Sequence, residues 1–164
     1  MLDDVLNHRL DGAIVAVDVE RSHLKRTPMY REDLLLIAST SMGPVRDIAD
    51  LRDKTVFMWP QGCPYRAALE HWLQEQGQKL PIVSVASYGA IVSCVSAGTG
   101  VALVPRGIYE QYRQGAGWVG YDFAELTAIS NLFYWHPGAG RHPAREAFVQ
   151  MLRDGLGEAA LQVG

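Results

Sequence analysis

The stretch Val95-Ser96-Ala97-Gly98-Thr99-Gly100-Val101-Ala102-Leu103-Val104-Pro105 predicts a helix end, a strand and a helix start in direct succession. Gly98 ends a helix expected over residues 88–97, because glycine readily adopts the left-handed conformation that closes a helix. The continuous apolar run 100–104 is typical of a strand buried on both faces. Pro105 suits the first turn of a helix that continues to about Gln114. The stretch therefore predicts the helix–strand alternation of α/β proteins.

The same alternation continues on the N-terminal side of this stretch. Strands are expected over residues 55–59 and 82–86, because both runs are rich in β-branched, aromatic and other apolar residues. A helix begins at Pro64 and ends at Gly77, and Ser87 is a suitable N-cap for the next helix. Strands that alternate with helices in this way favour a largely parallel sheet with helices on its faces.

Both ends of the chain fit the same class. Residues 2–10 predict an amphipathic helix, and a buried strand is expected over 12–17. Further strands are expected over 34–39 and 129–135, and Pro143 begins a last helix. Because the buried strand near the N-terminus needs neighbours on both sides, we expect the natural protein to begin before this chain does.

The composition limits the classes of protein that the chain can represent. Its 164 residues suit one domain or two small lobes, and 48% hydrophobic with 20% charged residues is typical of a folded globular protein. The longest apolar runs are far shorter than the roughly 20 residues that cross a bilayer. A net charge of −3 argues against tight nucleic-acid binding by this chain alone. Two cysteines form no disulfide framework, so we expect a reducing, cytoplasmic compartment.

The sequence contains no catalytic motif. Gly98-Thr99-Gly100 lacks the third glycine of a dinucleotide-binding loop, and Ser96 lacks the upstream glycine of a nucleophile elbow. The histidines are scattered, and the pair His136 and His142 lacks further ligands for a metal ion. We therefore expect no catalytic residue, no metal site and no cofactor.

Six runs of residues, in order along nearly the whole chain, together resemble the effector-binding domain of LysR-type transcriptional regulators. LDGAIV at 10–15 resembles the family's LDxAIV strand, MYREDLLLIA at 29–38 its PLxxExLxLVA, and IADL at 48–51 its LADL. QGCPYR at 61–66 is similar to its GxxxR loop, VSAGTGVALVP at 95–105 to VAAGLGIALLP, and REAF at 145–148 to its closing AxxAF helix. Met29-Tyr30 stands where the family usually has Pro-Leu.

The resemblance implies an α/β fold like that of type II periplasmic binding proteins, with two lobes, two crossover strands and a cleft between the lobes. Lobe I would comprise residues 1–29 and 129–164 and lobe II residues 30–128, with crossovers over 30–38 and 128–134. In the family, a winged helix-turn-helix, a linker helix and the first strand of the effector domain precede the matching region. We therefore expect this chain to lack the DNA-binding module and its first lobe to be incomplete.

The function that the resemblance implies is ligand sensing in the regulation of transcription. A small molecule in the cleft would shift the lobes, and a homodimer or homotetramer would transmit the shift to DNA-binding domains. This chain would then contact DNA only through the missing N-terminal module, and would not contact membranes. Two alternatives share the fold. A solute-binding receptor of a transport system needs an export signal, and a small enzyme such as a dehydratase needs an acid–base pair, which the expected strand ends do not show.

Candidate ligand-binding residues follow two of the expected strands. One helix begins a short loop after strand 55–59, and parallel strands place such loops at the edge of the sheet where ligands bind. The free N–H groups of a helix start favour an anion, Gly62 allows close approach of the backbone, and a helix start favours the thiolate form of a cysteine such as Cys63. Ser87 and Tyr88 begin the next helix at the same edge. The full candidate set is Gln61, Gly62, Cys63, Tyr65, Arg66, Ser87, Tyr88, Gly98 and Thr99.

Each candidate also has a purely structural interpretation. The first loop can be a simple turn with Cys63 as half-buried filler. Arg66 can clamp an anionic ligand, or it can pair with Glu70 four residues later on the helix. Ser87 can act as a helix cap alone, and Gly98-Thr99-Gly100 as a helix stop. A thiol at a helix start also allows a signal based on oxidation or on a sulfur compound instead of an anion.

Overall fold

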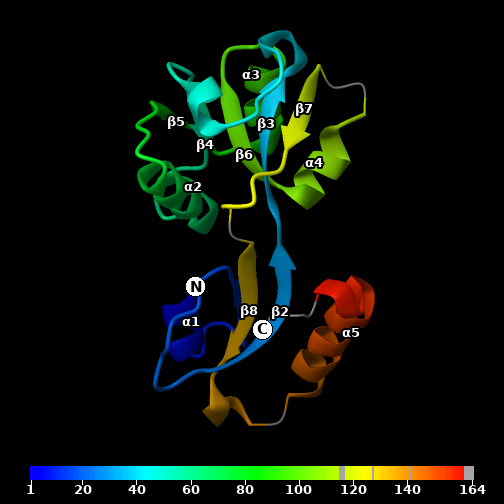
Figure 1. Ribbon diagram of the computed structural model, residues 1–164. Helices are drawn as coiled ribbons and strands as arrows, with labels where there is room; N and C mark the ends of the chain where they lie inside the picture. The colour runs from blue at the N-terminus through cyan, green and yellow to red at the C-terminus, as the bar shows by residue number, and fades with distance from the viewer. Residues whose placement is uncertain (115–116, 127, 141, 161–164) are drawn as a thin grey trace. The chain divides into compact units, whose positions relative to one another are not determined.

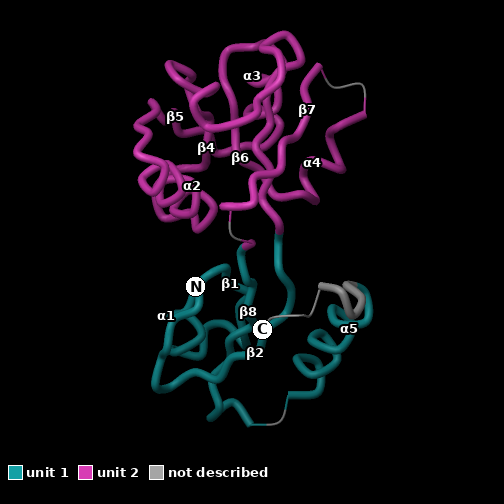
Figure 2. Tube along the Cα trace, in the orientation of Figure 1, with its two compact units in different colours: residues 1–32, 129–164 teal, residues 33–128 magenta. Residues whose placement is uncertain are grey.

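The chain builds two separate β-sheets (Figure 1). The computed structural model describes residues 1–114, 117–126, 128–140 and 142–160, with side chains described up to residue 155 in the last range. Each sheet belongs to one compact unit (Figure 2): unit 1 is Met1–Glu32 with Ile129–Gly164, and unit 2 is Asp33–Ala128.

Unit 1 contains a three-stranded antiparallel sheet with the order β1-β8-β2. The strands are β1 (Ala13–Val15), β8 (Ile129–Trp135) and β2 (Lys25–Glu32). The sequence does not predict β2 as a whole, because this edge strand is largely exposed and carries charged residues instead of an apolar alternation. Pro28 is tolerated because β2 is an edge strand, and the register shifts between Pro28 and Tyr30.

The crossing from unit 1 to unit 2 lies after Glu32, three residues later than the expected boundary between residues 29 and 30. Tyr30 and Glu32 still pair with Asn131 and Ile129, so β2 remains in the sheet of unit 1 to its end. The side-chain amide of Asn131 donates a hydrogen bond to the Glu32 carboxylate (3.2 Å). Burial, and secondarily the Glu32 charge, raise the pKa of the Tyr30 phenol.

Two helices pack on the sheet of unit 1. They are α1 (Leu2–Leu6), which contacts β8, and α5 (Pro143–Ala160), which contacts β2. α1 is shorter than the helix expected over 2–10, because Asn7 forms its C-cap and His8 takes a positive φ of 55°. The ring of Phe148 in α5 lies 6.2 Å from that of Phe133 in β8.

Unit 2 contains a five-stranded mixed sheet, ordered β5 (Ile82–Ser84), β4 (Val56–Met58), β6 (Val101–Pro105), β3 (Leu34–Ser39) and β7 (Trp118–Tyr121). β4 is parallel to β5 and β6, whereas β3 is antiparallel to β6 and β7. In this sheet β4, β5, β6 and β7 therefore all run in one direction, as expected for a largely parallel sheet, and β3 is the exception that runs against them. The physical reason is that β3 arrives directly from unit 1, without a helix between, and enters the sheet from the opposite end.

The core of unit 2 forms where α3 (Tyr88–Ser96) packs on β3, β4 and β6. The buried cluster comprises Ile37, Ile91, Val92, Val95, Ala102, Val104 and Trp118. Successive strand residues point to opposite faces, so Val101 and Leu103 face away from this cluster. The remaining helices of unit 2 are α2 (Pro64–Glu75), which contacts β6, and α4 (Arg106–Tyr112), which contacts β3 and β6. Short 3-10 turns are η1 (Thr40–Met42) and η2 (Ile48–Leu51) in unit 2, and η3 (Pro137–Ala139) in unit 1.

Two glycines shape the connection from α3 to β6. Gly98 has a φ of 73°, the left-handed conformation that ends a helix. Gly100 leaves no room for a side chain, because a Cβ there would lie 2.2 Å from the carbonyl oxygen of Thr55 and 2.9 Å from the ring of Phe57. The N–H of Val101 donates to the same Thr55 carbonyl (2.9 Å), so the close approach belongs to the pairing of β6 with β4.

Replacing Gly100 by alanine should destabilise the chain, because the backbone at Thr55 has to move. We expect the free energy of unfolding to fall by about 1–3 kcal/mol, the usual cost of overpacking. Gly107→Ala in α4 is the matched control, because a Cβ there meets no atom within 4 Å. Alanine is favoured over glycine inside a helix, so this substitution should raise the free energy of unfolding by about 0.5–1 kcal/mol. Urea unfolding followed by circular dichroism measures both variants, and equal stabilities would contradict the close packing.

Candidate functional site

The two loops that carry most of the candidate residues lie at one edge of the sheet of unit 2. β4 and β5 run parallel, with Met58 opposite Ser84, so the loops that follow them leave the sheet side by side. The N–H of Val85 donates to the carbonyl of Met58 (2.8 Å), and the ring of Tyr88 lies 5.3 Å from that of Trp59. The structure therefore brings the starts of α2 and α3 to the same edge.

The loop before α2 is exposed at its tip. Gln61 and Gly62 are exposed, and Cys63 and Tyr65 are half-buried. Gly62 has a φ of 90°, and no atom lies within 4 Å of the position that a Cβ would take. Cys63 is the N-cap residue of α2, but its side chain makes no capping hydrogen bond. The first turn of a helix carries N–H groups without intrahelical partners, and here the Cys63 side chain does not occupy them.

The start of α3 is capped by its own serine. Ser87 has an extended backbone, with a φ of −157°, and its Oγ accepts a hydrogen bond from the N–H of Ala90 (3.4 Å). This confirms the role of Ser87 as a helix cap. Ser87 remains exposed, whereas Tyr88 is half-buried and packs edge-on against Trp59.

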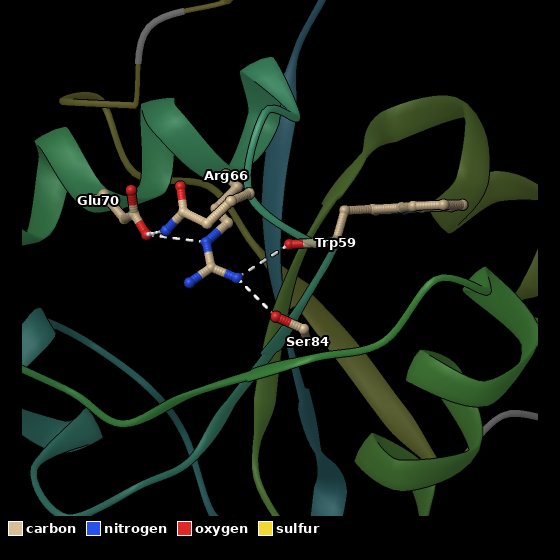
Figure 3. A network of polar contacts seen from close by, with 5 residues as sticks. Trp59, Arg66, Glu70 and Ser84 are labelled. Carbon is tan, nitrogen blue, oxygen red and sulfur yellow. Dashed lines mark hydrogen bonds and ion pairs between the residues drawn. The ribbon is translucent and has the colours of Figure 1, made fainter.

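A network centred on Arg66 connects the two loops (Figure 3). Its Nε donates to Oε1 of Glu70 (2.8 Å), and its Nη1 donates to Oγ of Ser84 (2.8 Å) and to the carbonyl of Trp59 (3.3 Å). The side-chain amide of Gln61 donates to the same Oε1 of Glu70 (3.0 Å). These hydrogen bonds connect the end of β4, the loop tip before α2 and the end of β5.

Of the two interpretations that the sequence leaves open for Arg66, the structure shows the pairing with Glu70. The side chain of Arg66 is only 10% exposed, and that of Glu70 is 38% exposed. A guanidinium that is bonded to Glu70, Ser84 and a backbone carbonyl has most of its donors in use. We therefore assign Arg66 a positioning role in this edge of unit 2.

Gly98 and Thr99 do not lie with the other candidates. They follow the C-terminal end of α3, whereas Ser87 and Tyr88 lie at its start. The hydroxyl of Thr99 donates to the carbonyl of Cys94 (2.8 Å), and a Cβ on Gly98 would lie 3.2 Å from Oγ of Ser41. The helix-stop interpretation of these two residues matches this geometry.

Ser84 is the residue of this network that the sequence does not single out. It is the last residue of β5. Because it is polar and exposed, it does not belong to the apolar run from which the strand is predicted. The strand expected over 82–86 ends two residues earlier in the structure, so its end could not be placed from the apolar run alone. The usable signal was the position of Ser84 near the carboxyl end of a strand parallel to β4.

In the described part of the chain, no three His, Cys, Asp or Glu side chains are grouped so that they could hold a metal ion. None of the helices in the described residues combines the length and the apolar character needed to span a bilayer.

Sequence comparison matches the chain to a known domain family. The family described as "LysR substrate binding domain" matches residues 1–157. The chain is 32% identical over 154 residues to the HTH-type transcriptional regulator GltR of Bacillus subtilis, in a match that covers 92% of the chain and 51% of GltR. The chain therefore spans about half the length of this curated relative.

Solved structures share the fold at low sequence identity. The regulatory domain of CcmR from Synechocystis PCC6803, in complex with 2-PG, superposes with a TM-score of 0.81 at 16% identity, covering 96% of the chain and 78% of that domain. The effector-binding domain of QuiR in complex with shikimate gives a TM-score of 0.73 at 16% identity, covering 92% and 74%. This likeness confirms the expected fold class.

Removing the Arg66 guanidinium should loosen unit 2, because Glu70, Ser84 and the Trp59 carbonyl lose a shared partner. We expect Arg66→Gln to lower the free energy of unfolding by about 2–4 kcal/mol. This loss is smaller than that for a fully buried ion pair, because Glu70 is partly exposed.

The matched control for this prediction is Arg113→Gln. Arg113 pairs with Glu110, and both side chains are largely exposed, at 56% and 48%. Loss of such a pair should change the stability by less than about 1 kcal/mol. Urea unfolding curves of the two variants test the difference, and a loss at Arg66 no larger than that at Arg113 would refute the connecting role.

Proposed function

The chain belongs to the family of LysR substrate-binding domains, and from this premise we propose that it is the ligand-sensing part of a bacterial transcriptional regulator. The observation that carries the proposal is the family match over nearly the whole chain, together with the shared fold. The named relatives are transcriptional regulators and not enzymes. No observation favours the transport receptor over the regulator.

We place the ligand at the edge of unit 2 where α2 and α3 begin. Gln61, Gly62, Cys63, Ser87 and Tyr88 would contact it, with Tyr65 beside them in the first turn of α2. Two helix starts offer N–H donors and partial positive charge to the same region, which favours a small anionic or strongly polar ligand. Arg66 would act indirectly, by holding the two loops in place. Gly98 and Thr99 are not included, because they lie beyond the other end of α3.

Two structural relatives support a small polar ligand. CcmR is in complex with 2-PG and QuiR with shikimate. Shikimate is a hydroxylated carboxylate, which is the ligand chemistry that exposed helix starts and hydroxyl groups suit. It is therefore a suitable first probe for this chain, without being identified as its natural ligand.

The regulator would act on DNA through a winged helix-turn-helix outside this chain, in the cytoplasm. Ligand binding would shift the population of conformations by the difference in affinity between them, and an oligomer would carry that shift to the DNA-binding modules.

Cys63→Ser separates two kinds of sensing at this edge. If the ligand is an anion held by helix N–H groups, its affinity should change by less than about 1 kcal/mol, the worth of one neutral hydrogen bond. If the signal is oxidation or a sulfur compound at the thiol, the response should disappear. Thermal unfolding with shikimate, inorganic phosphate and hydrogen peroxide measures both, with Cys94→Ser as the control because Cys94 lies inside α3.

The location of the site is tested by hydrogen exchange in the presence of the anion that stabilises the chain. Protection of amides in residues 59–66 and 84–90 is the expected result. Protection confined to other residues would contradict the proposed site. So would an unchanged protection by the anion in a Ser87→Ala, Gly62→Val double variant.

We also propose self-association of this chain. Among the described residues β1 pairs with β8 alone, and Leu10, Val17 and Val19 near it are exposed apolar side chains. Such edges and apolar residues favour pairing with another chain. Light scattering at micromolar concentration should give at least twice the monomer mass of 18.1 kDa. Val17→Lys should shift the protein towards the monomer, and a wild-type chain that is monomeric throughout would refute the proposal.

A further inference from the structure

Unit 1 contains a cavity of about 360 Å³ between α5 and the sheet formed by β2 and β8. Figure 1 shows α5 beside these strands. The lining residues of the cavity are Thr27, Phe133, Trp135, Arg145, Glu146, Val149, Gln150 and Arg153. Its volume lies within the roughly 300–1,000 Å³ of known small-molecule sites. All its lining residues belong to unit 1, so it is separate from the candidate edge in unit 2.

Arg145 carries a positive charge whose hydrogen-bonding capacity is not fully used. Its Nη2 donates to the carbonyl of Gly140 (2.9 Å), and its guanidinium carbon lies 5.8 Å from the centre of the Trp135 ring. Its Nη1 is buried and has no hydrogen-bond partner, and among the described residues no carboxylate forms an ion pair with Arg145. Arg145 as a whole is half-buried, so the unused capacity is confined to Nη1, where an acceptor supplied by a ligand would remove the cost of a shielded donor without a protein partner.

The rest of the lining combines further positive charge with apolar surface. Nη2 of Arg153 donates to the hydroxyl of Thr27 (2.8 Å), and within the described residues Arg153 also has no acidic partner. Glu146 supplies the one carboxylate of the lining, against two guanidinium groups. Phe133, Trp135 and Val149 supply apolar walls. The cavity therefore offers flat apolar contacts and a local excess of positive charge.

We propose that this cavity binds a small organic anion with a flat apolar body. The anionic group pairs with Arg145, whose planar guanidinium matches a carboxylate in geometry and supplies the acceptor that Nη1 lacks. The apolar body lies against Phe133, Trp135 and Val149. Arg153 adds positive charge at the other end of the lining, eight residues further along α5, or about 12 Å at 1.5 Å per residue.

Benzoate is the probe that tests this site, because it joins a carboxylate to a flat ring. Titration of the chain, followed by tryptophan fluorescence and calorimetry, should show saturable binding, and neutral benzamide and cationic benzylamine should bind at least about tenfold more weakly. Arg145→Gln should weaken the binding of benzoate by a similar factor, and Arg153→Gln should weaken it by a smaller factor. Arg52→Gln, an exposed arginine of unit 2, is the matched control and should bind benzoate like the wild type.

Arg145→Lys keeps the charge without the planar group and serves as a second variant if Arg145→Gln does not fold. It should bind benzoate with an affinity between those of the wild type and benzamide. Trp135→Phe should remove the fluorescence change. The proposal is overturned by any of three results: no saturable benzoate binding up to about 10 mM, which corresponds to less than roughly 3 kcal/mol, equal binding of benzamide, or a fluorescence change that persists in Trp135→Phe.

Discussion

In a parallel sheet the loops after neighbouring strands leave at the same edge, and the candidate site of unit 2 depends on this constraint. Because Met58 lies opposite Ser84, the starts of α2 and α3 become neighbours although they are far apart along the chain. Arg66 then holds the two strand ends together, with one donor directed at the Trp59 carbonyl and at the Ser84 hydroxyl. A guanidinium group suits this task, because its planar set of donors reaches several acceptors from one rigid group.

Arg66, which is buried, and Arg145, which is half-buried, illustrate two outcomes for an arginine. Nε and Nη1 of Arg66 both have acceptors, so its burial connects the loops around it. Arg145 instead keeps a buried Nη1 without a partner, beside a cavity with aromatic walls. The low polarity of a protein interior strengthens satisfied hydrogen bonds and penalises unsatisfied ones. The same residue type is therefore structural in unit 2 and points to a ligand in unit 1.

Under the proposed function, the hydrogen bonds that hold the loops of the candidate edge have a direct consequence for ligand binding. A ligand changes an equilibrium only by its difference in affinity between two conformations. Loops that the chain already holds in place cost less to order on binding, so more of the interaction with the ligand is retained as affinity. The exposed glycine at position 62 keeps the backbone accessible within this otherwise fixed edge.

The sequence by itself determined the local elements and the edge at which they meet. Pro64, Ser87 and Gly98 mark helix ends through short-range effects, so α2 and α3 lie where these residues predict them. Even the contact of Arg66 with Glu70 is local, since four residues make one turn of a helix. Only the tertiary structure decided what depends on register and on the path between the units. The antiparallel β3 follows from the crossing after Glu32, the exposed edge strand β2 lacks the apolar pattern that identifies buried strands, and β7 is only four residues long. The bond from Arg66 to Ser84 and the cavity beside Arg145 join residues from different elements, and no local pattern encodes such contacts because they exist only once those elements have packed.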